Sequence, residues 1–251
     1  MKKAIFSIIL LTLISCSEKK HSDLNGNVES LQEKEYDATE KFGEPIKGDL
    51  KNVNSYTFDN DGNLLKIIAY DSDGDKSYES NYQYKDGKNI LVKTQKKDFN
   101  LSTLKSKDVV ETQKLISDEN SQAIWTVNSE DQEKSYVDTV ITEYDNRHYP
   151  KTSTTKKHDG TQSISYFTYD KNGKMIEFKW LMNGKDTQQW EKYEYKDNLL
   201  VKQNILFMYG TERNDSITFN YKKDDKLNWI ERIRYENGKV DGLMERTINY
   251  R

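Results

Sequence analysis

A unit of about 26 residues recurs along the chain, and this repetition limits the fold more than any other feature. The steps between successive units are 26, 60, 25, 26 and 26 residues, and the step of 60 is about two periods with a weaker unit, Leu115 to Trp125, inside it. Constant spacing with variable residues predicts one structural unit copied along the chain. In each clear unit an aromatic residue is followed by a polar turn, at Phe58, Tyr84, Tyr144, Tyr169, Tyr195 and Tyr221.

Within a unit, aromatic and polar residues alternate with a period of two. Tyr82 and Tyr84 bracket Gln83, and Tyr193 and Tyr195 bracket Glu194, which is the pattern of a strand with one aromatic and one polar face. Pairs such as DG, NG, DN and DD separate the strands and favour tight turns. We therefore predict an all-β, repeat-built antiparallel β-meander, a curved or partly rolled extended sheet of β-hairpins, because strand twist disfavours a long flat sheet.

The acidic clusters FDNDGNL and DSDGD raise the question of calcium binding. An EF-hand loop places glycine at its sixth position and a ligand at its first. Five residues before Gly62 is Thr57, and five before Gly74 is Ala69, so neither register supplies the first ligand. We predict turns here and no metal site, although weak calcium binding by Asp59, Asp61, Asp71, Asp73 and Asp75 stays open.

The N-terminal segment has the pattern of a secretory signal. MKKAIFSIILLTLISC carries two lysines and a short apolar run before Cys16, which is the single cysteine of the chain. LISC resembles a bacterial lipobox, so residues 1–15 are predicted to be a lipoprotein signal peptide and Cys16 the site of lipidation. Residues 16–25 then form a polar tether that is attached to the membrane through the lipid anchor, and residues 26–251 form the repeat domain, with a soft boundary near 96–114.

Ser17 follows the cysteine, which in the usual sorting pattern implies an outer-membrane lipoprotein facing the periplasm or the cell surface. The formal net charge of −3 argues against a nucleic-acid partner, which would need a basic stripe. With Cys16 acylated no thiol remains, so disulfides and cysteine-ligated metals are excluded. We expect no cofactor.

The units YTFDNDGNLLKIIAYDSDG, YFTYDKNGKMIEFKWLMNGK and FNYKKDDKLNWIERIRYENGK resemble the YD repeats of Rhs and teneurin-type proteins. The region from Gly26 to Arg251 also resembles a family of uncharacterised Bacteroidota lipoproteins with degenerate Rhs-like repeats. The resemblance implies strands and turns rather than a catalytic site. Rhs repeats form a shell around a toxin, and this chain lacks both the length and a toxin segment for that role.

Outside the clear repeats, Val28 to Phe42 allows a helix by composition, but its apolar spacing is poor for a helix. Its counterpart in the family that the chain resembles looks like an entry strand, so we predict a strand. His148 and His158 flank a predicted turn, where with Asp145 or Asp159 they could ligate zinc or supply a base, although histidines in surface turns are far commoner. GxSxG and the phosphate-binding glycine loops are absent. We therefore predict that the protein is not an enzyme.

These features favour a non-catalytic cell-envelope lipoprotein whose β-repeat surface binds a protein or a polysaccharide. The candidate binding residues are Trp125, Trp180, Trp190 and Trp229, whose rings could stack on sugars. The competing interpretation is that the same rings form cross-strand pairs in the buried face. Immunity against a toxin and a glycan-processing accessory role remain alternatives.

Overall fold

The computed structural model describes residues 24–100, 105–130, 134–208 and 212–251. Sixteen β-strands are found in these residues. Their bounds are β1 Val28–Lys41, β2 Glu44–Phe58, β3 Leu64–Asp71, β4 Lys76–Lys85, β5 Lys88–Asn100, β6 Lys105–Glu119, β7 Gln122–Glu130, β8 Ser135–Tyr144, β9 Pro150–Lys156, β10 Gln162–Tyr169, β11 Met175–Met182, β12 Asp186–Lys196, β13 Leu199–Phe207, β14 Arg213–Lys223, β15 Trp229–Glu236 and β16 Lys239–Tyr250.

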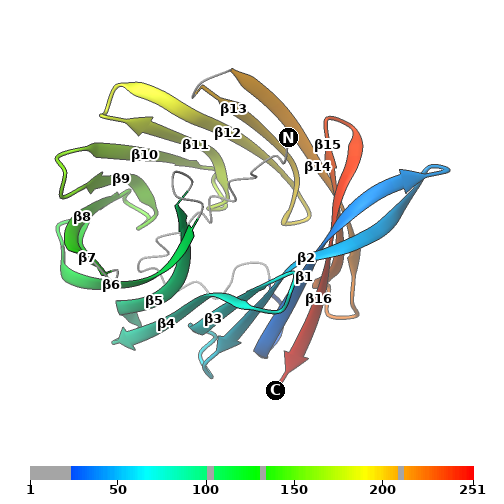
Figure 1. Ribbon diagram of the computed structural model, residues 1–251, viewed down its shortest axis with the longest axis horizontal. Coiled ribbons are helices and arrows are strands. Elements are labelled where there is room, and N and C mark those ends of the chain that lie inside the picture. The colour runs from blue at the N-terminus through cyan, green and yellow to red at the C-terminus, as the bar shows by residue number, and fades with distance from the viewer. Residues whose placement is uncertain (1–23, 101–104, 131–133, 209–211) are drawn as a thin grey trace.

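The strands close into a barrel (Figure 1). Each strand pairs antiparallel with the next, and β1 pairs with β16 from Val28↔Tyr250 to Asp37↔Gly242. The antiparallel all-β meander is confirmed, and Val28–Lys41 is a strand rather than a helix, as predicted. The partly rolled open sheet is wrong, because pairing of the first strand with the last leaves the described wall with no free edge.

Aspartates that follow the repeat aromatics close the hairpin turns by capping their own backbone. In the turn after β2, one side-chain oxygen of Asp59 accepts hydrogen bonds from the amides of Asp61 at 2.9 Å and Asn63 at 2.8 Å. Asp145, Asp170 and Asp224 make the same two bonds to the residues two and four positions on. The predicted turn chemistry of FDNDGNL is therefore confirmed.

The fourth residue of each of these turns has a positive φ. Gly62 and Gly173 take this left-handed conformation at little cost, with φ of 83° and 80°. In the corresponding place His148 and Leu227 have φ of 61° and 65° without being glycine. Such residues are strained by the contact between Cβ and the following carbonyl oxygen.

The repeat aromatics mark irregularities that bend the wall. Register shifts fall immediately before Phe58, Tyr84, Tyr144, Tyr169 and Tyr195, where an extra residue increases the local twist. Two of the six repeat aromatics, Tyr84 and Tyr221, also join neighbouring hairpins. The hydroxyl of Tyr84 donates to the carbonyl of Leu64 at 3.0 Å, and that of Tyr221 donates to the carbonyl of Leu200 at 2.6 Å.

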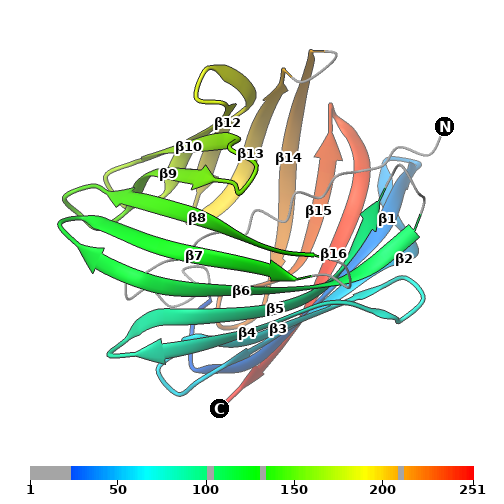
Figure 2. The same cartoon turned by 60° about the vertical axis from the view of Figure 1, so that its left-hand side comes forward.

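The ring of strands is not uniformly curved. In Figures 1 and 2 the strands from β5 to β9 curl tightly, and those from β12 to β16 form a wider arc. The tight part contains a cluster of buried side chains, Ala123, Trp125, Val127, Val140 and Tyr144. Of the stretch 96–114, where a soft boundary was predicted, residues 96–100 and 105–114 are described and lie on β5 and β6, which pair from Leu91↔Lys114 to Asn100↔Lys105.

Candidate functional site

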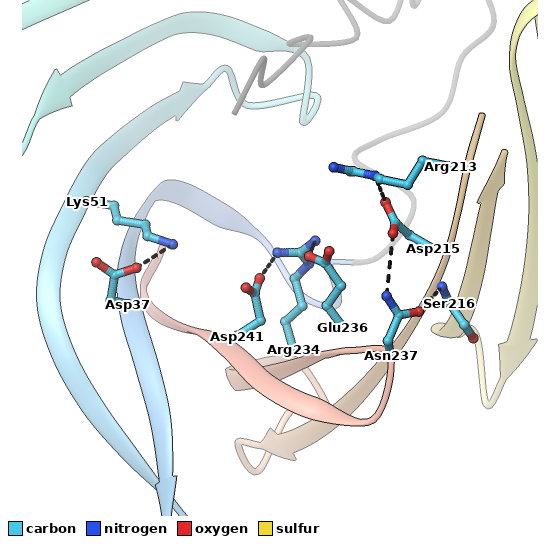
Figure 3. Close-up of polar contacts among 9 residues, drawn as sticks. All are labelled: Asp37, Lys51, Arg213, Asp215, Ser216, Arg234, Glu236, Asn237 and Asp241. Atoms are coloured by element: carbon cyan, nitrogen blue, oxygen red, sulfur yellow. Dashed lines mark hydrogen bonds and ion pairs between the residues drawn. The ribbon is translucent and has the colours of Figure 1, made fainter. Parts of the chain in front are cut away.

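The two faces of the wall carry different side chains. Figure 3 shows charged residues of β1, β2 and β14 to β16 lying inside the ring, so the inward positions of these strands are fixed. Residues that pair across two strands share a face of the sheet, and successive residues along a strand alternate between the two faces. The strand pairing therefore shows which side chains face inward on the remaining strands. On β11, Phe178 and Trp180 point inward, and Glu177 and Lys179 point outward.

The outward face is charged. Outward lysine and glutamate form partly exposed ion pairs on three parts of the wall, Lys66–Glu79 at 2.9 Å, Lys202–Glu194 at 3.2 Å and Lys179–Glu177 at 3.5 Å. Outward apolar side chains with large exposed fractions, such as Val137 and Tyr166, lie on separate strands. By the same strand pairing, other outward apolar side chains pair across strands, Ile124 with Ile141 and Ile164 with Leu181, and they lie among these charged residues.

One end of the lumen contains paired charges (Figure 3). Arg234 contacts Glu236 at 3.0 Å and also pairs with Asp241. Lys51 contacts Asp37 at 2.7 Å across the β1–β2 pair. The side chain of Asp215, which is 5% exposed, pairs with Arg213 at 2.5 Å and accepts a bond from Asn237 at 3.4 Å. These charges neutralise one another and hold the strand ends together.

The other end of the lumen is built around Trp229. The guanidinium of Arg246 lies 3.4 Å from the centre of the Trp229 ring and donates from Nε to Glu33 at 2.7 Å. This ion pair is deeply buried, with side chains 6% and 11% exposed, and it joins β16 to β1 across the closure of the barrel. The hydroxyl of Tyr56 donates to the second oxygen of Glu33 at 3.0 Å, and burial, followed by the charge of Glu33, raises the pKa of Tyr56.

A cavity of about 450 Å³ lies against this cluster. It extends along the inner wall from the turn after β10 to β16 and β1. Its rings come from Tyr169, Tyr195, Tyr221 and Trp229, and its basic groups are Lys174, Arg232 and Arg246. A second hollow of about 260 Å³ lies between the start of β1 and the Asp59 turn.

The four predicted tryptophans lie in different environments. Trp125 and Trp229 are inward and 2% and 3% exposed, and Trp180 is inward and half-buried. Trp190 is on the outward face, where its Nε1 donates to Glu177 at 2.7 Å and its ring lies between Lys179 and Lys192. The structure thus brings only Trp229 to the cavity. Their role in binding stays a prediction.

The other predicted chemical groups do not converge. Cys16 lies outside the described residues. His158 stacks on Tyr136 and contacts Asp138 at 3.0 Å, whereas His148 lies in the turn after β8. In the described ranges no group of three or more histidines, cysteines and acids could hold a metal ion. No helix in those ranges is long and apolar enough to cross a membrane.

Sequence reasoning missed the residues that form the cavity's basic side, Arg232 and Arg246, and their neighbour Glu33. A signal for one of them was present in ERIRYE, where Arg232, Arg234 and Glu236 recur every second residue. Such a row indicates charges on one face of a strand. It does not say that this face is the inner one.

No protein-family model matches the chain, and no curated protein matches its sequence. Among solved structures, the chain is similar to a porin-like protein from Bacteroides uniformis ATCC 8492, with a TM-score of 0.43, 10% identity and coverage of 90% of this chain and 99% of that chain. It is also similar to a porin-like protein from Bacteroides vulgatus ATCC 8482, with a TM-score of 0.42, 11% identity and coverage of 88% and 98%. Likeness at this level carries no functional argument.

The interpretation that an exposed β-repeat surface binds a protein or a glycan is wrong, together with its alternatives of toxin immunity and glycan processing. That interpretation needs an open sheet with an accessible aromatic face. The sheet is instead a closed barrel, and the repeated aromatics line its lumen. The physical reason is that alternation specifies two unlike faces, whereas closure decides which of them is enclosed.

Proposed function

We propose that the chain is a barrel with a water-exposed wall that holds a small molecule in its lumen. The observation that carries this proposal is the direction of the side chains. Rings such as Phe178, Tyr195 and Trp229 face inward, whereas Lys66, Lys179 and Lys202 face outward. A wall in contact with hydrocarbon needs the reverse arrangement, with an outward apolar band and a polar interior.

A transmembrane pore is the alternative that the closed ring of 16 strands favours, since barrels of this size can enclose an aqueous channel. The outward charges oppose it. An outward lysine at the middle of a bilayer costs about 2–4 kcal/mol. This wall carries outward lysines on β3, β11, β12 and β13. The cumulative cost favours water outside the barrel.

The membrane attachment that we propose is the lipid on Cys16 at the outer membrane rather than the barrel wall. Acyl chains contribute about 0.8 kcal/mol for each buried methylene group, so several chains hold a folded domain at a bilayer without any insertion of the wall.

Fractionation of cells tests the proposal. One form is the full chain, and in the other residues 1–16 are replaced by a cleavable secretory signal without a cysteine. We expect the first form in the membrane fraction and the second in the soluble periplasmic fraction. Retention of the second form in outer membranes after a carbonate wash would show that the wall itself inserts.

Conductance across planar bilayers gives an independent measurement. The purified second form is expected to produce no stepwise current at micromolar concentration, because its wall cannot enter the hydrocarbon. Stable single-channel steps would instead favour the pore. A known outer-membrane pore serves as the positive control for bilayer quality.

A further inference from the structure

The cavity beside Trp229 has an excess of positive charge. Its lining in the described chain includes three basic residues, Lys174, Arg232 and Arg246, and one carboxylate, Glu33. Arg246 and Glu33 neutralise each other at 2.7 Å. The positive charges of Lys174 and Arg232 therefore remain, and they favour a negatively charged ligand.

Arg232 has hydrogen-bonding capacity that its surroundings do not use. Its guanidinium stacks 5.0 Å from the Trp229 ring centre and 5.2 Å from that of Phe219, which fixes its plane. The one acceptor that it contacts in the described chain is the sulfur of Met244 at 3.4 Å, and a thioether is a weak acceptor. Five N–H donors in a planar fork match a carboxylate, which accepts two parallel bonds.

The rings of the cavity come from successive repeats. Tyr169, Tyr195 and Tyr221 are spaced by 26 residues and lie on β10, β12 and β14. The bond from Tyr221 to the carbonyl of Leu200 fixes one ring, and Lys174 lies 5.6 Å from the centre of Tyr195. Burial raises the pKa of Tyr195 to about 12, so this ring is neutral at physiological pH and does not repel an anion.

We infer that this cavity binds a small planar carboxylic acid, with its carboxylate on Arg232 and its ring against the tyrosines. The inference rests on the proposed function, since it needs a lumen that holds a small molecule. The volume of about 450 Å³ falls in the range of small-ligand sites, which limits the ligand to one or two rings. Aromatic faces favour an offset-stacked ring.

Calorimetric titration of the purified barrel tests the inference with four named probes. Indole-3-acetate and 4-hydroxybenzoate carry the carboxylate, and tryptophol and 4-hydroxybenzyl alcohol are their neutral counterparts. We expect at least one acid to bind tenfold or more tightly than its alcohol. Equal affinities within both pairs, or no binding of any probe, would overturn the inference.

Variants then assign the binding to Arg232. Arg232→Gln is expected to weaken binding of the acid by tenfold or more and to leave the alcohol unchanged. Arg232→Lys keeps the charge but loses the fork, so an intermediate loss is expected. Lys192→Gln removes one positive charge from the outward face of β12 and is the matched control, with less than a twofold change.

Thermal unfolding of each variant separates a local loss from misfolding. If Arg232→Gln does not fold, the affinity for the acid is measured with Arg232→Lys instead. Unchanged affinity for the acid in the variant that folds would contradict the role of Arg232. Equal binding of inorganic phosphate would contradict the planar carboxylate. A barrel that stays soluble in the fractionation experiment but binds no acid refutes this inference alone, whereas a barrel that inserts in membranes refutes the proposed function.

Discussion

The inner faces of β7–β8 and β14–β16 are built on the same two-stranded unit, yet one is filled and the other contains a cavity. On β7 and β8 the inward residues include Ala123, Trp125 and Val140, which pack into a buried cluster. On β15 and β16 the corresponding positions carry Arg232 and Arg246 beside open space. The repeat thus determines the wall, and the identity of the inward side chains determines whether the lumen is solid or hollow.

The largest expected effect is on the filled side. Trp125→Ala removes a ring that is 2% exposed, and we expect the free energy of unfolding to fall by about 3–5 kcal/mol because a cavity is left in the cluster. Urea denaturation measures the loss. Trp190→Ala on the outward face is the matched variant and should cost about 1 kcal/mol, since its ring mainly contacts two lysines. Equal losses would contradict the difference between the faces.

The ion pair on the hollow side gives the next effect. Arg246→Met leaves Glu33 buried without its cation, so we expect a loss of about 3 kcal/mol in the free energy of unfolding. Lys202→Met breaks the exposed pair with Glu194, whose side chain is 59% exposed, and should cost about 0–1 kcal/mol. Denaturant unfolding of both variants measures the contrast. A small loss in Arg246→Met would show that water reaches Glu33 once the cation is removed.

The turns allow a smaller comparison between two backbone positions of the same kind. Leu227→Gly relieves a positive φ of 65° and should stabilise the barrel by about 1 kcal/mol. Gly74→Ala, at φ of 85° with nothing within 4 Å of an added Cβ, should destabilise it by a similar amount. Shifts of the melting temperature in opposite directions are expected. A shift in the same direction would mean that side-chain contacts of Leu227 outweigh its backbone strain.

The smallest effect concerns pH on the outward face. Hydrogen bonds from Lys66, followed by those from Lys76, lower the pKa of Glu79 from 4.5 to about 2. Its contribution to stability is therefore complete above pH 4.5 and is lost as the pH falls towards 2. Glu79→Gln should remove a fraction of a kcal/mol at pH 7 and flatten this part of the stability profile, as measured by denaturation between pH 2 and pH 7. An unchanged profile would show that the lysines do not act on Glu79 in solution.

Much of the local structure could be predicted from the sequence. Antiparallel hairpins were predicted from the 26-residue spacing, the alternation around Tyr82 and Tyr193 and the glycine-bearing turns. FDNDGNL does not fit the spacing of an EF-hand loop and was predicted to be a turn, and its first aspartate does cap a turn. These features depend on residues near one another in the chain. Turn geometry and strand alternation are local consequences of backbone sterics and hydrogen bonding.

The closure and the cavity could not be predicted in this way. Pairing of Val28 with Tyr250 depends on the summed twist and bulges of all the intervening strands. The meeting of Glu33 with Arg246, 213 residues apart, follows from that closure. Each strand adds a small twist or bend to the sheet, and the sum over all strands decides whether the first strand meets the last. No single repeat unit determines that sum.

The sequence by itself therefore determined the unit, its turns and the presence of two unlike faces. Only the tertiary structure decided that the aromatic face is enclosed, that lysines cover the outside and that Arg232 lies beside a cavity. Alternation is a property of a strand, whereas inside and outside are properties of a closed surface.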